Sequence, residues 1–131
     1  MTDKLNQSHS NPKIILIVDD ELSILQVLEQ FIKRLRPNYQ VMTATDGMAA
    51  WILLQQQAFD LLVTDYEMPQ INGLQLIQRT RQILPEIPVM LMSGQSEIDL
   101  QSKIQSLEWV TFIAKPFTLI QFNTELKILG L

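Results

Sequence analysis

The chain has 131 residues, 47% of them apolar and 18% charged, which suits one globular domain with a single hydrophobic core. Its net charge of −4 argues against a nucleic-acid partner, because proteins that bind phosphate backbones cluster Lys and Arg, and the absence of Cys excludes disulfides, thiolate chemistry and Cys-bound metals. No apolar run approaches the roughly 18 residues of a membrane span, and the polar N-terminus lacks a signal-peptide pattern, so we expect a cytoplasmic protein with no membrane contact.

The N-terminal segment and the first predicted strand differ in composition. Residues 1–12 are polar and aperiodic, so we expect a disordered tail, in which His9, the only histidine, is interpreted as a solvated side chain. Residues 13–18 form a β-branched, continuously apolar run, which is typical of a strand buried on both faces of a parallel sheet. This run stops at the acidic triplet Asp19-Asp20-Glu21.

Apolar residues spaced by three or four predict five amphipathic helices. The first helix stops at Pro37, and its predicted inward residues are Leu22, Leu25, Leu28, Ile32 and Leu35. The second helix extends from Gly47 to about Gln57, with Asp46 as its cap. Its predicted inward residues are Ala50, Leu53 and Leu54.

The last three helices begin at recognisable start signals. Asn72-Gly73 opens the third helix, which closes before Pro85. Ser96 and Asp99 resemble a capping box for the fourth helix, whose predicted inward residues are Leu100, Ile104 and Leu107. Thr118 and Gln121 start the fifth helix, whose predicted inward residues are Leu119, Phe122, Leu126 and Leu129.

Short apolar runs alternate with these helices and predict further strands at residues 39–44, 59–64, 87–92 and 110–114. Strands that alternate with helices through short connections predict an α/β fold, in which a five-stranded parallel sheet carries helices on both faces. The chain shows no internal repeat and no linker to a second domain. We therefore expect one domain over residues 13–131, with no output domain.

Charged and hydroxyl side chains follow four of the predicted strands. The first strand ends at Asp19-Asp20, the third at Asp65, the fourth at Ser93 and the fifth at Lys115. In an open α/β sheet, ligands bind outside the carboxyl ends of the strands, so these side chains should converge on one crevice. Three carboxylates in one crevice repel each other, and a hard divalent cation would compensate that repulsion. Mg²⁺ is the expected cation, and Mn²⁺ could replace it.

The same side chains suit phosphoryl chemistry. A carboxylate such as Asp65 can act as a nucleophile toward phosphorus and form an aspartyl phosphate. The metal ion, the ammonium group of Lys115 and the hydroxyl group of Ser93 would together stabilise the three equatorial oxygens of the phosphoryl group.

Four motifs stand at these strand ends. They are the apolar run closed by Asp19-Asp20, the nine residues from Asp65 to Gly73 (D-x-x-M-P-x-x-x-G), Met92-Ser93-Gly94, and Lys115-Pro116-Phe117. Together and in this order they resemble the response-regulator receiver domain of bacterial two-component signalling, over about residues 13–131. The resemblance implies a flavodoxin-like (βα)5 fold with strand order 2-1-3-4-5 and a cis bond between Lys115 and Pro116.

The resemblance also implies a role for each matching site residue. Asp65 would accept a phosphoryl group from the phosphohistidine of a sensor histidine kinase or a histidine phosphotransfer protein. Mg²⁺ would be held by Asp19, Asp20, Asp65 and the main-chain carbonyl of Glu67. Lys115 would pair with the phosphoryl group, in a switch that gains and loses its own phosphoryl group and is not a turnover enzyme.

The implied switch residues are Ser93, which would donate to the phosphoryl group, and Phe112, which would turn inward. Phe112 lacks the hydroxyl of the tyrosine often found there, so its movement would depend on packing alone. An unknown protein target would read the face of the fourth helix, fifth strand and fifth helix, in a stand-alone regulator that is a monomer or weak homodimer. Ile120 and Ile128 lie off the core stripe of the last helix and are candidates for a partner face.

The sequence departs from the family pattern in two places. Glu108-Trp109 stands where a Gly-Ala pair commonly allows close packing before the fifth strand. Gly94 stands where Ala often follows the hydroxyl residue, and it adds backbone freedom at the switch loop.

Other functions, and purely structural roles for the same residues, are alternatives to the receiver-domain interpretation. A flavin or nucleotide carrier would need an anion cradle rich in Gly, Ser or Thr after the first strand, where this chain has three acids. An aspartyl-phosphate hydrolase would need a positioned second acid, for which Glu67 is the candidate, and a receiver-like module would bind partners without phosphorylation. In structural readings, Asp65 caps a helix, Glu21 only caps and charges a helix N-terminus, and Phe112 is plain core.

Overall fold

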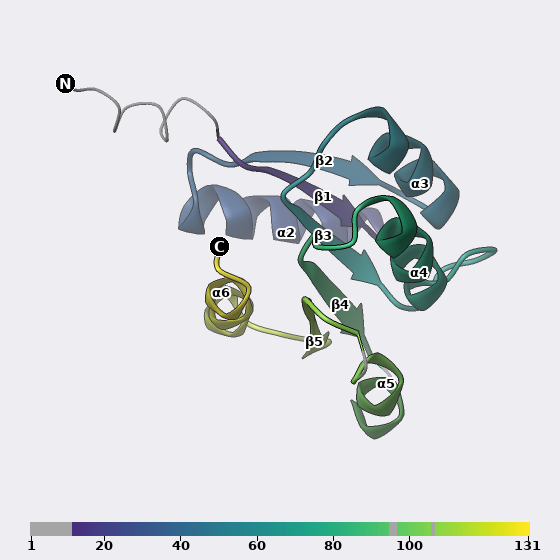
Figure 1. Ribbon diagram of the computed structural model, residues 1–131. Helices are drawn as coiled ribbons and strands as arrows, with labels where there is room; N and C mark the ends of the chain where they lie inside the picture. The colour runs from purple at the N-terminus through teal and green to yellow at the C-terminus, as the bar shows by residue number, and fades with distance from the viewer. Residues whose placement is uncertain (1–11, 95–96, 106) are drawn as a thin grey trace.

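The computed structural model describes residues 12–94, 97–105 and 107–131. Within them, a parallel five-stranded sheet has the order β2-β1-β3-β4-β5, as predicted (Figure 1). The strands are β1 (Ile14–Val18), β2 (Gln40–Ala44), β3 (Leu61–Asp65), β4 (Val89–Ser93) and β5 (Val110–Ala114). The helices are α2 (Leu22–Leu35), α3 (Gly47–Gln56), α4 (Gly73–Ile83), α5 (Glu97–Ile104) and α6 (Leu119–Ile128).

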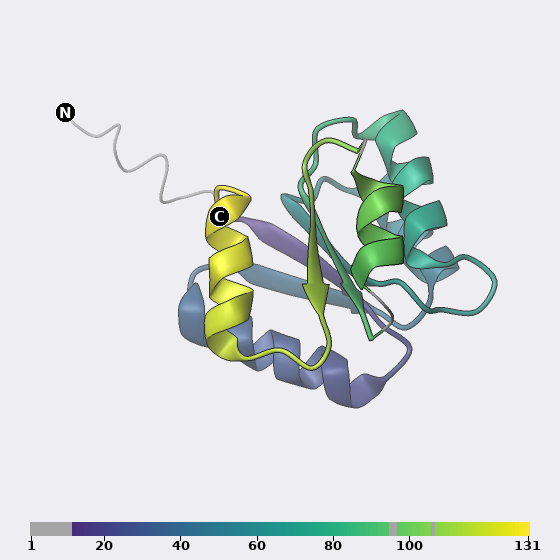
Figure 2. The same ribbon diagram turned by 90° about the horizontal axis from the view of Figure 1, so that it is seen from below.

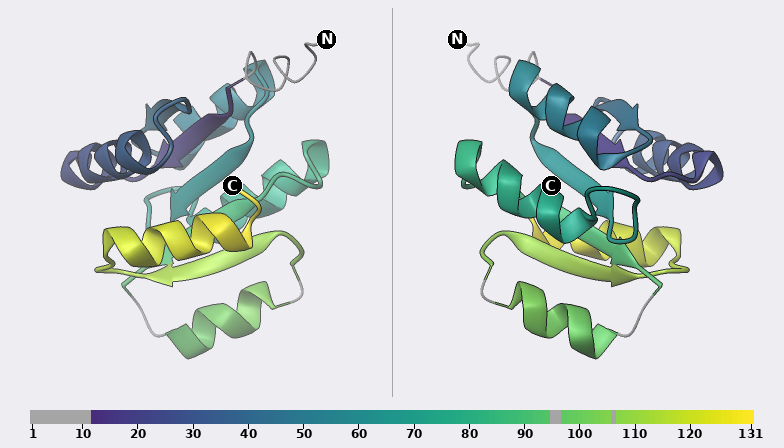
Figure 3. Two further views of the ribbon diagram at one scale, coloured as in Figure 1. Left: turned by 90° about the vertical axis from the view of Figure 1, so that its left-hand side faces the viewer. Right: turned by 90° about the vertical axis from the view of Figure 1, so that its right-hand side faces the viewer.

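Helices cover both faces of the sheet. α2 and α6 lie on one face, and α3, α4 and α5 lie on the other (Figure 2). Alternate residues of β1 point to opposite faces, so Ile15 and Ile17 pack against α2 and α6, while Leu16 and Val18 pack against α3 and α4. This is why the predicted strands read as continuous apolar runs. α5 lies at the β5 edge of the sheet, away from α2 (Figure 3).

Local side-chain hydrogen bonds fix several helix starts. Asp46 accepts from the backbone N–H of Ala49 at 2.7 Å, as predicted for the cap of α3. Thr118 and Gln121 form the predicted capping box of α6. A second capping box, which the sequence analysis did not identify, joins Asn72 and Gln75 at the start of α4.

Three predictions about the helices are wrong. Leu22 is 64% exposed, because it is the first residue of α2 and the inward stripe begins only at Leu25. Leu107 lies beyond the end of α5, although it is partly buried against the same core. Glu21 stands at the N-cap position of α2, so its charge lies at the helix N-terminus as interpreted, but the predicted side-chain cap is wrong because its side chain makes no cap hydrogen bond in the described part of the chain.

Other predictions differ at the boundaries or fall outside the described residues. β3 and β4 each begin two residues later and end one residue later than predicted, so Asp65 and Ser93 are their last residues. Ser96 and residues 1–11 lie outside the described residues, and with them the predicted capping box and the predicted tail. None of the helices in the described ranges has both the length and the apolar character needed to cross a bilayer.

The turn before β5 accommodates Trp109 through an unusual backbone conformation. Trp109 has a φ of 65°, in the left-handed region, and its side chain is 53% exposed. Its carbonyl still accepts from the N–H of Val89 at 2.8 Å, so the pairing of β4 with β5 is intact. Arg81 of α4 supports this turn, since its guanidinium donates to the carbonyls of Ile87 at 2.7 Å and Glu108 at 2.8 Å.

Candidate functional site

The carboxyl ends of the central strands bring the predicted site residues together. Asp19 follows β1 directly and Asp65 ends β3, and these two strands are neighbours in the sheet. Ser93 ends β4 on the other side of β3, and Lys115 follows β5. The backbone N–H of Lys115 donates to the carbonyl of Ser93 at 2.8 Å, which ties the ends of β4 and β5 to each other.

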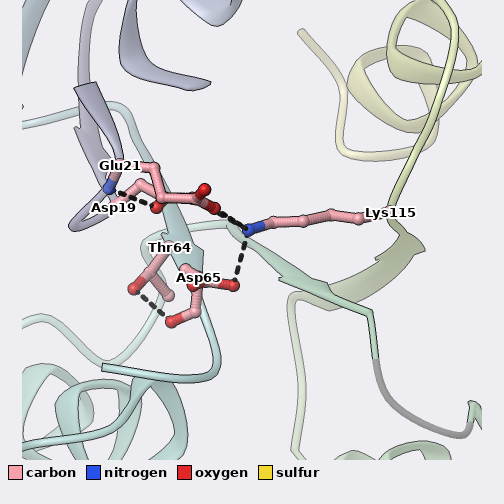
Figure 4. A network of polar contacts seen from close by, with 5 residues as sticks. All are labelled: Asp19, Glu21, Thr64, Asp65 and Lys115. Atoms are coloured by element: carbon pink, nitrogen blue, oxygen red, sulfur yellow. Dashed lines mark hydrogen bonds and ion pairs between the residues drawn. The ribbon is translucent and has the colours of Figure 1, made fainter. Parts of the chain in front are cut away.

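Lys115 bridges the two buried carboxylates (Figure 4). Its Nζ lies 3.0 Å from Asp19 Oδ2, as a hydrogen bond, and 3.1 Å from Asp65 Oδ1, as an ion pair. Glu21 Oε1 lies 4.0 Å from the same ammonium group. Burial acts to lower the pKa of Lys115, but the contacts with Asp19 and Asp65 outweigh it and raise the pKa above its ordinary value. The ammonium group is therefore charged at neutral pH.

The carboxyl group of Asp65 lies in an unfavourable environment for its negative charge. The residue is 4% exposed, and burial raises its pKa from the usual 3.8 to about 6. The contact with Lys115 lowers this pKa, while the negative charges of Asp19 and Asp20 raise it further. Oδ1 has no hydrogen-bond partner of good geometry among the described residues, so the ion pair with Lys115 compensates it only in part.

The backbone of Asp65 is held closely. Its carbonyl accepts from the hydroxyl of Thr64 at 3.0 Å. A Cβ on Gly73 would lie 2.4 Å from the same carbonyl oxygen, so only glycine allows α4 to start this close to the end of β3. The N–H of Tyr66 donates to the carbonyl of Met92 at 2.8 Å. The Thr64 hydroxyl contact is one that the sequence analysis missed, because a Thr inside an apolar run gives no signal of its own.

Three carboxylates form a set that fits a divalent cation. Oxygen atoms of Asp19, Asp20 and Asp65 all lie within 4.8 Å of one another. Asp19 is held in place through Oδ1, which accepts from the N–H of Glu21 at 2.9 Å, and Asp20 is exposed to solvent. A cluster of hard oxygen donors, one of them open to water, is the kind of site that Mg²⁺ uses. Glu67 lies in the exposed loop after β3.

The two predicted switch residues differ in burial. Ser93 is fully buried at the end of β4. Phe112 is half-buried in β5 and packs toward the core shared by α3, α4 and α5. It also lines an open pocket of ≈ 530 Å³ between α5 and β5, together with Ile104 and Leu107. Phe112 therefore has unfilled space beside it on the α5 side.

Other predicted features can be placed directly. The peptide bond between Lys115 and Pro116 is cis, as the resemblance implied. Ile120 is 77% exposed and Ile128 is 65% exposed, as expected for residues off the core stripe of α6. Glu21, which was interpreted as a charged residue at a helix N-terminus, also places a carboxylate near Lys115. Its position two residues after Asp19 was the sequence signal for this proximity.

Known proteins share this sequence pattern and this fold. Residues 15–127 match the family model described as the response regulator receiver domain. The chain is 28% identical to sporulation initiation phosphotransferase F of Bacillus subtilis, covering 86% of this chain and 90% of that protein. It is 35% identical to response regulator GtcR of Aneurinibacillus migulanus over 80% of this chain, and it spans only 42% of that longer protein.

Solved structures agree with the fold. The chemotaxis protein CheY4 of Vibrio cholerae superimposes with a TM-score of 0.82 at 22% identity, covering 91% of this chain and 99% of that chain. A signal receiver domain from an HD domain-containing protein of Pseudomonas fluorescens superimposes with a TM-score of 0.82 at 26% identity, covering 92% and 95%. Because the family model spans nearly the whole described fold and its strand-end residues meet in one site, this chain belongs to the response-regulator receiver-domain family, whose members act as signalling switches in two-component systems.

Proposed function

We propose that this protein is a phosphoacceptor switch in a two-component phosphorelay, in which Asp65 takes a phosphoryl group from a phosphohistidine donor with the help of Mg²⁺. The observation that carries the proposal is the position of Lys115, whose ammonium group lies 3.0 Å from Asp19 and 3.1 Å from Asp65 beside a third carboxylate. The three carboxylates can hold a divalent cation, and that cation together with Lys115 would supply the positive charge that a dianionic phosphoryl group needs.

The proposed transfer is a displacement at phosphorus. A carboxylate oxygen of Asp65 forms a bond to phosphorus as the bond between phosphorus and the donor's imidazole nitrogen breaks. The electron pair of the broken bond stays on that nitrogen, which then takes a proton from solvent. Lys115 exchanges its contact with the Asp65 carboxylate for a contact with a phosphoryl oxygen. Mg²⁺, when bound by Asp19, Asp20, Asp65 and the carbonyl of Glu67, would neutralise charge on the phosphoryl oxygens.

The proposed output is a change in the face formed by α5, β5 and α6. The backbone hydrogen bond between Ser93 and Lys115 supports a link from the phosphoryl site to β5. Phe112 lies opposite Leu91 in the neighbouring strand, beside the open pocket under α5, so space is available for it to repack. The phosphoryl group would later be lost by hydrolysis. The protein would then return to its resting state, as a switch does, and would not turn over a substrate as an enzyme does.

The proposed partners are a sensor histidine kinase or a histidine phosphotransfer protein upstream, and a protein target downstream. One relative of similar length is named a sporulation initiation phosphotransferase, and another, from Brucella abortus, is named response regulator receiver protein CpdR. Both names are consistent with the proposed phosphotransfer.

The test is labelling by a small phosphodonor in the presence of Mg²⁺. The protein should gain one hydroxylamine-labile phosphoryl group, and Asp65→Asn should gain none. Asp60→Asn is the matched control, because Asp60 lies just before the opposite end of β3 and accepts from the N–H of Ile14, a contact that an Asn oxygen can keep. Undiminished labelling of Asp65→Asn would overturn the site assignment.

The role of the metal is tested separately. Removal of divalent cations with a chelator should stop labelling of the unchanged protein, and readdition of Mg²⁺ or Mn²⁺ should restore it. Labelling that persists at its full rate in chelator would exclude the metal from the proposed reaction.

A further inference from the structure

We infer that Gly47, the first residue of α3, is a positioning residue for the loop that follows Asp65, an inference that rests on the proposed function of Asp65. This loop, residues 66–72, connects β3 to α4 and contains the carbonyl of Glu67. Gly47 lies outside the four strand-end motifs and comes from a different helix. Gly47 is distant from the loop in sequence and reaches it because α3 packs against α4.

The loop is compact and closed on itself. The N–H of Gly73 donates to the carbonyl of Tyr66 at 2.8 Å, which joins its two ends, and the N–H of Ile71 donates to the carbonyl of Pro69 at 2.8 Å. The side chains of Met68 and Ile71 are buried in the core that α3 and α4 share. We therefore expect a displacement at Ile71 to shift Met68 and the adjacent Glu67, because all three lie in the same closed loop.

Gly47 is the point at which α3 meets this loop. A Cβ at position 47 would lie 2.9 Å from the carbonyl oxygen of Ile71 and 3.0 Å from its Cβ, closer than van der Waals contact allows. Neither atom can rotate away, so a side chain at position 47 must displace the loop backbone or the start of α3. Of the described glycines only Gly130 has a positive φ, so Gly47 is required for space and not for backbone conformation.

Two glycines thus allow close contacts at the two ends of the loop. Gly73 allows α4 to begin against the carbonyl of Asp65, and Gly47 allows α3 to begin against the carbonyl of Ile71. Gly73 belongs to the phosphorylation-site motif, and its replacement would strike Asp65 directly. A Cβ at Gly47 would meet Ile71 and not Asp65, so replacement of Gly47 tests whether the position of the loop, and with it the Glu67 carbonyl, controls Mg²⁺ binding.

The experiment compares Gly47→Ala with Met48→Ala in the full chain. Met48 is the next residue of the same helix and is 40% exposed, so its truncation leaves the loop contact intact. The Mg²⁺ dissociation constant is measured by calorimetry, and the initial rate of labelling is measured at limiting Mg²⁺. Because displacements of a fraction of an ångström to 1 Å cost large factors in rate, we expect Gly47→Ala to slow labelling about tenfold and to weaken Mg²⁺ binding. Met48→Ala should match the unchanged protein.

These readouts separate positioning from simple structure. Ala is a better helix former than Gly, so a purely structural role at position 47 would alter unfolding and leave Mg²⁺ affinity unchanged. A Gly47→Ala variant that folds and binds Mg²⁺ with the affinity of the unchanged protein would overturn the inference. If Gly47→Ala does not fold, Ile71→Ala decides, because it removes volume from the same contact. We expect Ile71→Ala to weaken Mg²⁺ binding as well, and unchanged affinity there would overturn the inference.

Failure of the proposed function would look different. In that case the unchanged protein would not be labelled at all, whereas the difference in Mg²⁺ affinity between Gly47→Ala and Met48→Ala would still report on the position of the loop.

Discussion

Lys115 donates a hydrogen bond of 3.0 Å to Asp19, a carboxylate with no exposed surface, although the two residues are 96 positions apart in the chain. This contact joins the segment after β5 to the segment after β1 across the carboxyl ends of β3 and β4, which lie between them in the sheet. It places a positive charge next to Asp65 before any phosphoryl group arrives. The resting site is therefore organised by a cation that the proposed reaction also uses.

Replacement of Lys115 should affect the free energy of unfolding and the labelling rate in ways that can be measured separately. Lys115→Met leaves Asp19 and Asp65 buried without their cation, which should lower the free energy of unfolding of the metal-free protein by about 3 kcal/mol. It should also slow labelling by about 100-fold, because a group that contacts the transferred phosphoryl is lost. Mg²⁺ should bind more tightly than before and restore much of the lost stability, since it no longer competes with an ammonium group.

Urea unfolding with and without Mg²⁺ measures these stability effects, and Lys127→Met on the exposed side of α6 serves as the control. Weaker Mg²⁺ binding by Lys115→Met would contradict the view that the ammonium and the metal share one set of carboxylates.

The raised pKa of Asp65 predicts a specific pH dependence of stability. Because the pKa rises from the usual 3.8 in the unfolded chain to about 6 in the folded one, the folded state holds a proton that the unfolded state has lost between these values. Its contribution to the free energy of unfolding is complete below about pH 4 and is lost as the pH rises through 6. Asp65→Asn should therefore stabilise the metal-free protein at pH 7.5, by on the order of 2–3 kcal/mol.

Thermal or urea unfolding between pH 4 and pH 8 in chelator measures this difference. It should be much smaller at pH 4, where Asp65 is protonated in the folded state and only partly ionised in the unfolded one, and it should vanish only well below pH 3.8. An Asp65→Asn variant that is less stable than the unchanged protein at pH 7.5 would show that the ion pair with Lys115 outweighs burial.

The sequence was sufficient for the architecture because the parallel sheet imposes a simple pattern on it. Residues such as Ile15 and Leu16 lie on opposite faces and are both buried, so each strand reads as an unbroken apolar run. Once the strands are recognised, their shared carboxyl edge places Asp19, Asp65 and Lys115 together without further information.

Features that depend on contacts between distant segments could not be predicted in this way. The apolar spacing of α2 does not reveal that Leu22, its first residue, is exposed. Gly47 resembles any helix-start residue until Ile71 is found 2.9 Å from where its Cβ would be. Arg81 resembles a surface residue of α4, yet it joins that helix to the turns before β4 and β5.

Trp109 offers a test of backbone strain outside the site. A non-glycine residue in the left-handed region costs roughly 1–2 kcal/mol, and Trp109 has a φ of 65° while 53% of it is exposed. Trp109→Gly should relieve the strain at a small loss of packing, and should raise the free energy of unfolding by about 0.5–1 kcal/mol. Trp109→Ala keeps a Cβ, so it should bring no such gain. Equal stability of the Gly and Ala variants, measured by urea unfolding, would indicate that the conformation carries no strain.

Arg81 should be a determinant of stability that does not affect the site. Burial lowers its pKa from the ordinary value, and the guanidinium donates to the carbonyls of Ile87 and Glu108 at the opposite end of the sheet from Asp65. Arg81→Gln should lower the free energy of unfolding by about 2–3 kcal/mol, the range expected for hydrogen bonds from a charged group. Arg81→Lys should recover only part of this, because one ammonium group lacks the planar fork that reaches both carbonyls.

The exposed Arg79 on the same helix provides the control as Arg79→Gln, which should change stability by less than about 0.5 kcal/mol. Mg²⁺ affinity and labelling rate should stay unchanged in all three variants, since the hydrogen bonds of Arg81 within the described ranges lie at the end of α4 and before β4 and β5, far from the carboxyl ends of the strands. Full recovery by Arg81→Lys would show that charge alone stabilises this turn. A loss of Mg²⁺ affinity in folded Arg81→Gln would instead show that the two ends of the sheet are coupled through α4.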